Sequence, residues 1–260
     1  MVHGSAAEAY ERLIGRWSRA AAPAFLDFVG LAAVDRVLDL GCGTGALTRA
    51  LVDRYPAATI IGLDLQHDYL QACRDAWPAP RYQFLQGDAT DLPFQNRQFD
   101  AVLSMLLLML VPDPNRVTAE TLRVLCPGGI AAAATWDDLR FELIRDFWDV
   151  ALALDPHAPS RNGRGHSVWP GSLAALWQSC GFTDVVEETF DLDMRFDDPA
   201  DIWTALRAGV GPAGAYVAAL PPARCDRLRL SLERRWAARL RSGRGFAARM
   251  LLVRGRRLPG

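Results

Sequence analysis

Short apolar runs alternate along this chain with segments in which apolar residues recur every three or four positions. A short apolar run is typical of a buried parallel strand, and the wider spacing is typical of a helix that packs by one face. Strands that alternate with helices predict a doubly wound α/β sheet, mostly parallel. The predicted strands are 37–40, 58–63, 82–86, 99–104 and 130–135, and the predicted helices between them are 46–53, 66–77 and 115–125.

The flanking segments add helices and two more strands. Apolar residues spaced by three or four positions from Tyr10 to Trp17, and again over 22–29, predict two helices before the first strand. Pro127-Gly128-Gly129 predicts a turn into the fifth strand. The later helices are predicted over 141–154, 172–180 and 199–241, and the later strands over 185–192 and 246–253.

Three glycines, Gly41, Gly43 and Gly45, follow the first predicted strand and open a helix. Such a turn leaves backbone N–H groups and a helix N-terminus open to a ligand, and the missing side chains allow close approach. The segment therefore predicts a cradle for a nucleotide-type cofactor. It also fits the looser dinucleotide pattern, because Ala46 follows and Asp64 lies 23 residues after Gly41, which leaves a nicotinamide enzyme open.

Asp39 stands at the strand end just before the glycines. A carboxylate there suits a positively charged ligand better than a pyrophosphate. The segment 36–48 resembles motif I of the class I S-adenosylmethionine-dependent methyltransferases. Gly-Asp-Ala-x-x-Leu-Pro-Phe at 87–94, followed by Phe-Asp-x-Val-x-Ser at 99–104, is also similar to that family and is more specific than the glycines. The resemblance covers residues 34–136, about two fifths of the chain.

The resemblance implies that S-adenosyl-L-methionine binds and that S-adenosyl-L-homocysteine is the product. It implies that Asp64 accepts hydrogen bonds from the ribose hydroxyls, and that Asp88 meets the adenine amino group beside a backbone N–H. Residues 10–19 look like the N-terminal lid of some small-molecule methyltransferases, and aromatic faces attract a cation. The predicted cofactor-binding residues are Tyr10, Trp17, Asp39, Gly41, Cys42, Gly43, Asp64, Leu65, Asp88, Ala89 and Ser104.

The family fold would make residues 1–260 one methyltransferase domain, a Rossmann-like seven-stranded sheet with a helical cap and, at 246–253, an antiparallel edge strand. The ubiquinone/menaquinone-biosynthesis-like branch is the most similar. Many relatives carry a His pair where this chain has Met109-Leu110, so no role of those histidines carries over. The cofactor-binding core is predicted over 34–136, 172–192 and 244–260, and the cap, where the substrate is chosen, over 1–33, 137–171 and 197–243.

The implied reaction is in-line SN2 transfer of a methyl group to an O, N or C nucleophile, driven largely by positioning. A base is needed only for a nucleophile that is protonated at neutral pH. The candidates are His166, in a Pro, Gly and Arg-rich loop at 155–170, and Asp137, after the fifth strand. The four histidines form no i, i+4 pair and the five cysteines lack Cys-x-x-Cys spacing, so no metal site is predicted.

The composition of the chain limits the classes of molecule that it is expected to bind. A formal net charge of −1 and a pI of about 6.4 argue against a general nucleic-acid or membrane binder. The longest apolar run, 101–111, is too short to span a bilayer. Scattered cysteines and the lack of a signal peptide suggest a cytoplasmic protein. A small, partly apolar methyl acceptor is predicted, in view of the Trp-rich cap and the apolar wall at 105–109.

Charged residues are unevenly distributed along the chain, and this distribution is also compatible with other functions. Residues 181–201 hold eight acids and one Arg, whereas residues 224–260 hold twelve Arg and two acids. We expect these Arg side chains to solvate a helix and to pair with the acidic stretch, although an RNA-binding surface would look similar. An RNA or protein methyltransferase, and a non-catalytic cofactor-binding protein, remain the alternatives. The sequence does not indicate the oligomeric state.

Overall fold

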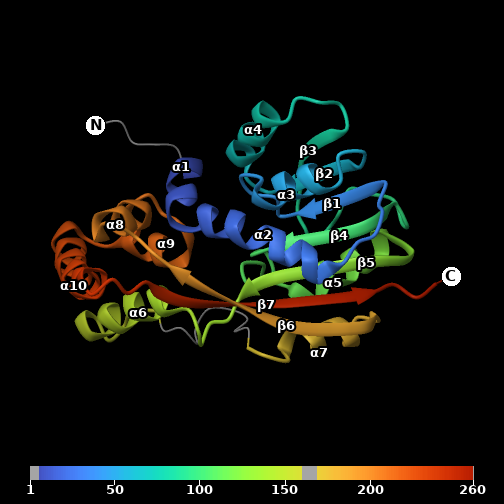
Figure 1. Ribbon diagram of the computed structural model, residues 1–260. Coiled ribbons are helices and arrows are strands. Elements are labelled where there is room, and N and C mark those ends of the chain that lie inside the picture. The colour runs from blue at the N-terminus through green and yellow to red at the C-terminus, as the bar shows by residue number, and fades with distance from the viewer. Residues whose placement is uncertain (1–5, 160–168, 260) are drawn as a thin grey trace. The chain divides into compact units, whose positions relative to one another are not determined.

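The computed structural model describes residues 6–159 and 169–259, so the predicted base His166 lies outside the described residues. The described chain falls into two compact units (Figure 1). The first, called here the sheet unit, contains residues 17–136, 169–190 and 250–259. The second, the helical unit, contains residues 6–16, 137–159 and 191–249.

Seven strands form one sheet in the order β3-β2-β1-β4-β5-β7-β6. The pairs β1–β2, β2–β3, β1–β4 and β4–β5 are parallel, whereas β5 and β7 are antiparallel. The seven-stranded α/β sheet predicted from the sequence is confirmed, with the reversed strand at 246–256. The prediction that this strand forms the edge was wrong, because β7 lies between β5 and β6 and β6 takes the edge. The strands are β1 Arg36–Leu40, β2 Thr59–Asp64, β3 Tyr82–Gln86, β4 Phe99–Met105, β5 Leu125–Trp136, β6 Thr183–Met194 and β7 Phe246–Arg256.

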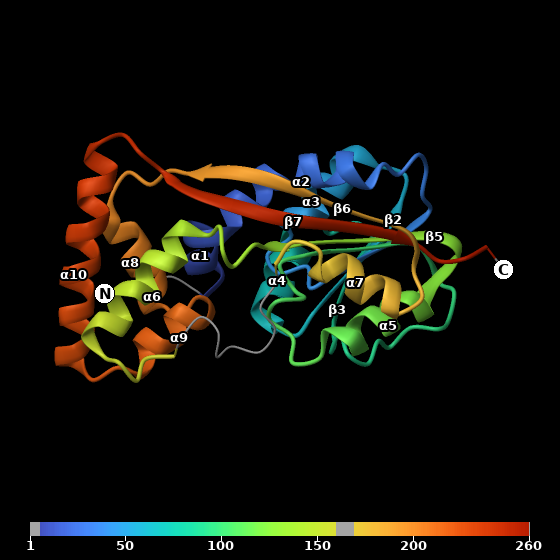
Figure 2. The same cartoon turned by 90° about the horizontal axis from the view of Figure 1, so that it is seen from below.

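Helices cover both faces of the sheet in the sheet unit (Figures 1 and 2). On one face lie α2 Arg16–Val29, α3 Ala46–Arg54 and α4 His67–Ala76, and on the other α5 Pro114–Val124 and α7 Ser172–Ser179. The second face holds the larger core, in which Leu38 and Leu40 pack with Val117 of α5 and Trp177 of α7. Burial of these apolar faces is the main force that holds the helices on the sheet.

Local signals place the ends of these helices. Asp113 accepts a hydrogen bond from the Arg116 N–H at 3.0 Å, and Pro114 occupies the first position of α5, as the Asp-Pro pair predicted. Helix α7 ends before Gly181, whose φ of +97° suits glycine.

The helical unit is built from α1 Ala6–Tyr10, the π-helical turn Glu11–Gly15, α6 Glu142–Leu154, α8 Pro199–Arg207, α9 Gly211–Ala219 and α10 Pro222–Arg241. Helices α6, α8, α9 and α10 pack against one another (Figure 2). On α10, Cys225, Leu228, Leu232 and Trp236 are at most 4% exposed, whereas Leu240, the next residue of this apolar stripe, is half-buried.

The sequence predictions were wrong at two boundaries. The two N-terminal helices are not separated, because residues 6–29 are helical throughout and the stretch 18–21 (Ser-Arg-Ala-Ala) contains no helix breaker. The turn predicted at 127–129 is an irregularity inside β5. There Leu125 pairs with Phe99 and Ile130 with Ala101, and Gly128 takes a φ of +77°.

The expected pairing of the Arg-rich segment with the acidic stretch was only partly right. Arg249 does pair with Asp191, at 2.6 Å. On α10, however, Arg235 pairs with Asp146 at 2.6 Å and Arg239 with Glu142, both on α6. The basic helix therefore finds most of its counter-charges inside the helical unit.

None of the described helices is both long and apolar enough to cross a membrane. Within 6–159 and 169–259, no group of three or more His, Cys, Asp or Glu side chains could hold a metal ion.

Candidate functional site

The glycine loop between β1 and α3 is shaped by positive φ angles at each of its three glycines. Gly45, at +85°, packs so closely that a Cβ would lie 2.5 Å from the Trp77 ring. Gly43, at +52°, is the opposite case, because a Cβ there would meet no described atom within 4 Å. The backbone of Gly43 therefore borders open space, as a cradle for a ligand requires.

The Asp64 carboxylate joins the end of β2 to this loop. One oxygen accepts a hydrogen bond from the Gly43 N–H at 2.8 Å, and the other accepts from the Gln66 N–H at 2.9 Å. Each carboxylate oxygen has a further lone pair, so Asp64 can also accept from ligand hydroxyls. Leu65, the next residue along the chain, is 62% exposed, so it can contact a ligand only from the solvent-exposed side of this strand end.

Asp39 lies on the same face of the sheet as Asp64. Its register partner on β2 is Gly62, two residues before Asp64, and side chains two apart share a face. Asp39 is 1% exposed and one oxygen accepts from the Thr48 hydroxyl at 2.6 Å, whereas the other has no partner within the described residues. Burial, and then the charge of Asp64, raises the pKa of Asp39 to about 7.

The two thiols below the loop have a structural role. Cys73 donates through its thiol to the Gly43 carbonyl at 3.4 Å. The hydrogen bond with Cys73, followed by burial, raises the pKa of the Cys42 thiol well above its ordinary value. Because a thiol held protonated is a poor nucleophile, Cys42 can serve a ligand only through its backbone.

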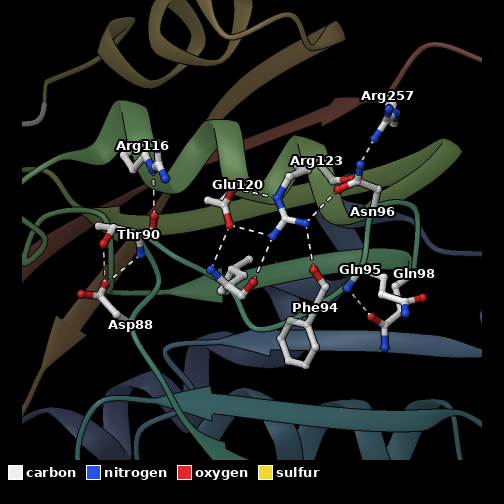
Figure 3. A network of polar contacts seen from close by, with 11 residues as sticks. Asp88, Thr90, Phe94, Gln95, Asn96, Gln98, Arg116, Glu120, Arg123 and Arg257 are labelled. Atoms are coloured by element: carbon white, nitrogen blue, oxygen red, sulfur yellow. Dashed lines mark hydrogen bonds and ion pairs between the residues drawn. The ribbon is translucent and has the colours of Figure 1, made fainter.

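Asp88 and Ala89 follow β3 at the next strand end. One oxygen of Asp88 accepts from both the N–H and the hydroxyl of Thr90 at 2.8 Å, and these bonds lower the pKa of the exposed carboxyl (Figure 3). Ala89 is 7% exposed, and within 6–159 and 169–259 its N–H donates no hydrogen bond. The second Asp88 oxygen and the Ala89 N–H therefore form an acceptor and donor pair for a ligand.

The register of β4 fixes the direction of the Ser104 side chain. Asp39 is in register with Leu103, so the side chain of Ser104 points to the opposite face of the sheet. Its hydroxyl is buried and has no partner in the described parts of the chain. If Ser104 contacts the same ligand as Asp39, it does so through its backbone.

Sequence reasoning missed the strained turn that follows. Leu106 takes a φ of +64°, which is unusual for a leucine and typical of functional sites. The next residue, Leu107, covers Gly41, where a Cβ would lie 3.0 Å from the Leu107 side chain. Leu107 therefore leaves no room for a side chain at Gly41. No propensity signal marks this turn, because leucine favours negative φ.

The remaining predicted site residues are divided between the two units. Trp17 is half-buried in the sheet unit, whereas Tyr10 and Asp137 belong to the helical unit. Asp137 is 1% exposed, accepts from the Leu139 N–H at 2.9 Å, and donates its own N–H to the Arg249 carbonyl at 2.8 Å. Contact of Tyr10, Trp17 or Asp137 with a ligand stays a prediction.

Comparison with known proteins decides the family. Residues 37–129 match the model of a methyltransferase domain. The chain is 33% identical over 185 residues to the malonyl-[acyl-carrier protein] O-methyltransferase of Geobacter sulfurreducens, covering 68% of this chain and 67% of the relative. It is 30% identical over 203 residues to the demethylmenaquinone methyltransferase of Clavibacter sepedonicus, covering 73% and 78%.

The chain belongs to the class I S-adenosylmethionine-dependent methyltransferases. The resemblance stated from the sequence is confirmed, and the nicotinamide alternative was wrong. A solved structure, phosphoethanolamine N-methyltransferase 2 of Haemonchus contortus with S-adenosylhomocysteine, has the same fold at a TM-score of 0.61 and 16% identity. The alignment covers 97% of this methyltransferase and 57% of that chain.

Proposed function

We propose that this methyltransferase binds S-adenosyl-L-methionine in the cradle formed by the ends of β1, β2 and β3. The observation that carries the proposal is the buried, unpartnered oxygen of Asp39 beside the open space at Gly43. An unpaired buried carboxylate oxygen is costly, and a cationic ligand would relieve that cost. The cradle thus fits a ligand with positive charge rather than a pyrophosphate.

Each part of the cofactor would have its own partner. Asp39 would face the positive charge of the amino group and sulfonium, and Asp64 would accept from the ribose hydroxyls. Asp88 would accept from the adenine amino group while the Ala89 N–H donates to the ring. Gly41, Cys42 and Gly43 would contribute backbone only, for the reasons of space and thiol chemistry given above.

We propose a small, partly apolar molecule as the methyl acceptor. The two curated relatives are named for different acceptors, malonyl-[acyl-carrier protein] and demethylmenaquinone, so their names do not choose one. The segment after β4 supports the apolar choice, because 105–110 is Met-Leu-Leu-Leu-Met-Leu and Leu110 is 59% exposed. We propose that the helical unit selects the acceptor.

When bound, the cofactor supplies a sulfonium-activated methyl group for in-line displacement by an O, N or C nucleophile. The protein holds the acceptor collinear with that methyl group and excludes water. A base would be required only for an acceptor protonated at neutral pH. Asp137 and His166 are the proposed bases, each holding the acceptor's proton on a carboxylate oxygen or a ring nitrogen.

The test is transfer of isotopically labelled methyl groups to a panel of carboxylic acids, phenols and amines that carry alkyl or aryl portions. The expected result is labelling of one chemical class, reduced by excess S-adenosylhomocysteine. Labelling of RNA or protein instead would move the proposal to those acceptors. Binding of S-adenosylhomocysteine without transfer to any acceptor would make the chain a cofactor-binding protein.

His166→Ala separates the two proposed bases once an acceptor is known. A changed pH profile of kcat would support His166 as the base, with Asp137→Asn as the matching variant. Profiles unchanged in both variants would show that the reaction needs neither base.

A further inference from the structure

The loop from Asp88 to Asn96, which joins β3 to β4, is held by side chains of α5 (Figure 3). At its middle, Leu92 donates its N–H to one Glu120 oxygen at 2.8 Å. The carbonyl of the same residue accepts from Arg123 at 3.0 Å. Two side chains one turn apart on the helix thus hold both backbone groups of Leu92, as a neighbouring strand would.

Arg123 uses all of its hydrogen-bond donors in this arrangement. A guanidinium has five N–H groups, and Arg123 donates five hydrogen bonds. Two go to Glu120, both at 2.7 Å, and the other three go to the loop: the carbonyls of Leu92 and Phe94 and the side-chain oxygen of Asn96, at 3.0, 2.8 and 2.9 Å. Glu120 is 8% exposed and its bonds to Arg123 are partly buried, whereas the bond from Arg123 to Asn96 lies at the surface.

A second contact from α5 reaches the loop closer to Asp88. Arg116 donates through Nε to the Thr90 carbonyl at 2.9 Å, and Thr90 donates twice to Asp88 (Figure 3). The position of the Asp88 carboxylate and the Ala89 N–H is therefore set by a chain of hydrogen bonds that starts on the helix. The loop has no helix or strand of its own to fix them.

We propose that Glu120 and Arg123 are positioning residues for recognition of the purine base. They fix the loop so that the second Asp88 oxygen and the Ala89 N–H present an acceptor and a donor that match the 6-amino group and ring nitrogen of adenine. This inference rests on the proposed cofactor site. It predicts that selectivity for adenine depends mainly on Glu120 and Arg123 and in smaller part on Arg116, all of which act only through the loop.

The test compares two ligands by calorimetry: S-adenosylhomocysteine and S-inosylhomocysteine, whose 6-oxo group would face the Asp88 carboxylate. Wild type is expected to prefer the adenine compound by about tenfold or more, the size of a hydrogen bond to a charged group. In Arg123→Lys and Glu120→Gln the preference should fall below about threefold. Lysine has one charged centre and cannot reproduce five planar donors.

Arg257→Gln is the matched control. Arg257 donates to the carbonyls of Leu122, Arg123 and Leu125 at 2.7, 3.0 and 3.0 Å, so it supports the end of the same helix without a bond to the loop. Its variant should keep the wild-type preference. An equal loss in Arg257→Gln would show general loosening of α5 and would overturn the inference, as would an unchanged preference in Arg123→Lys.

Failure of the proposed function would look different. Wild type that binds neither compound would refute the cofactor site itself. Wild type that binds both equally would leave the site standing and overturn the inference about the base.

Two further measurements cover the case in which an Arg123 variant does not fold. Arg116 is exposed and makes one bond to the loop, so Arg116→Gln should fold and reduce the preference partly. Hydrogen exchange on the Glu120→Gln protein should speed up in peptides covering 87–97 by at least about tenfold and stay unchanged in β1 and β4. Wild-type exchange in that loop, or a wild-type preference in Arg116→Gln, would contradict the inference.

Discussion

The carboxylate of Asp64 accepts a hydrogen bond from the N–H of Gly43 at 2.8 Å, which ties the end of β2 to the glycine loop after β1. The two residues are 21 positions apart and belong to different motifs. Asp64 is the acid proposed to hold the ribose. Through this bond it also fixes Gly43, the glycine that borders the open space of the cradle. Cofactor binding would therefore depend on Asp64 both directly and through the loop.

Replacing Asp64 by Ala should weaken S-adenosylmethionine binding by more than about 1 kcal/mol, because at least one hydrogen bond to a charged group is lost. Calorimetry at constant pH measures this directly. Asp68→Ala is the control, since Asp68 is an exposed acid one helical turn further along the chain. Equal affinities for wild type and Asp64→Ala would remove Asp64 from the site.

Asp39→Asn should make the ligand-free protein more stable at pH 8. The pKa of Asp39 is raised from 3.8 to about 7, so the folded state binds this proton more tightly than the unfolded state. Stability is therefore lost as pH rises from 3.8 to about 7. Asn cannot ionise and can still accept from Thr48, so the gain should be roughly 2–4 kcal/mol.

Urea unfolding of wild type and Asp39→Asn at pH 5.5 and 8 checks the sign. The advantage of the variant should be larger at pH 8, where most of the wild-type carboxylate is ionised. A variant less stable than wild type at pH 8 would contradict the buried-charge argument.

Binding of the cationic cofactor should itself depend on pH. Below pH 7 Asp39 is protonated in the free protein and must lose its proton to face a cation. The affinity for S-adenosylmethionine should thus rise by up to about tenfold per pH unit towards pH 7 and then level off. Asp39→Asn should bind weakly with a flat profile, and a wild type equally flat between pH 5.5 and 8 would count against the role of Asp39.

Two glycine variants should separate stability from binding. Gly43→Ala places a methyl group in open space at a φ of +52°, so it should cost only about 1–2 kcal/mol of stability yet sharply weaken cofactor binding. Gly45→Ala drives its methyl group into the Trp77 ring at a φ of +85° and should destabilise by more, about 2–4 kcal/mol. Thermal unfolding with calorimetry distinguishes them, and equal loss of stability would refute the contrast.

Much of the sheet could be read from the sequence because its central strands β1, β2, β4 and most of β5 are buried on both faces. The runs around Val37 and Ile60 do not alternate between apolar and polar residues, so they are readily recognised as buried strands. The ends of two helices are marked by residues with specific end preferences, Asp113-Pro114 at a helix start and Gly181 after a helix end. The same periodicity predicted that Asp39, Asp64 and Asp88 stand at the ends of the first three strands.

What could not be predicted depends on contacts between distant residues. Nothing in the spacing of Glu120 and Arg123 distinguishes an ordinary i, i+3 surface pair from a pair that holds Leu92, 28 residues earlier in the chain. The unusual φ of Leu106 is imposed by its surroundings against its own preference. The bond between Cys73 and the Gly43 carbonyl is equally invisible in the sequence.

Both compact units are assembled from separate stretches of chain, and the polypeptide passes from one to the other between residues 16 and 17, 136 and 137, 190 and 191, and 249 and 250, among other places. The last two of these passages lie inside continuous strands, β6 and β7. A single proteolytic cut would therefore yield a nicked protein instead of two separable fragments. An attempt to graft a new acceptor specificity would have to exchange several segments together, with the junctions placed inside paired strands.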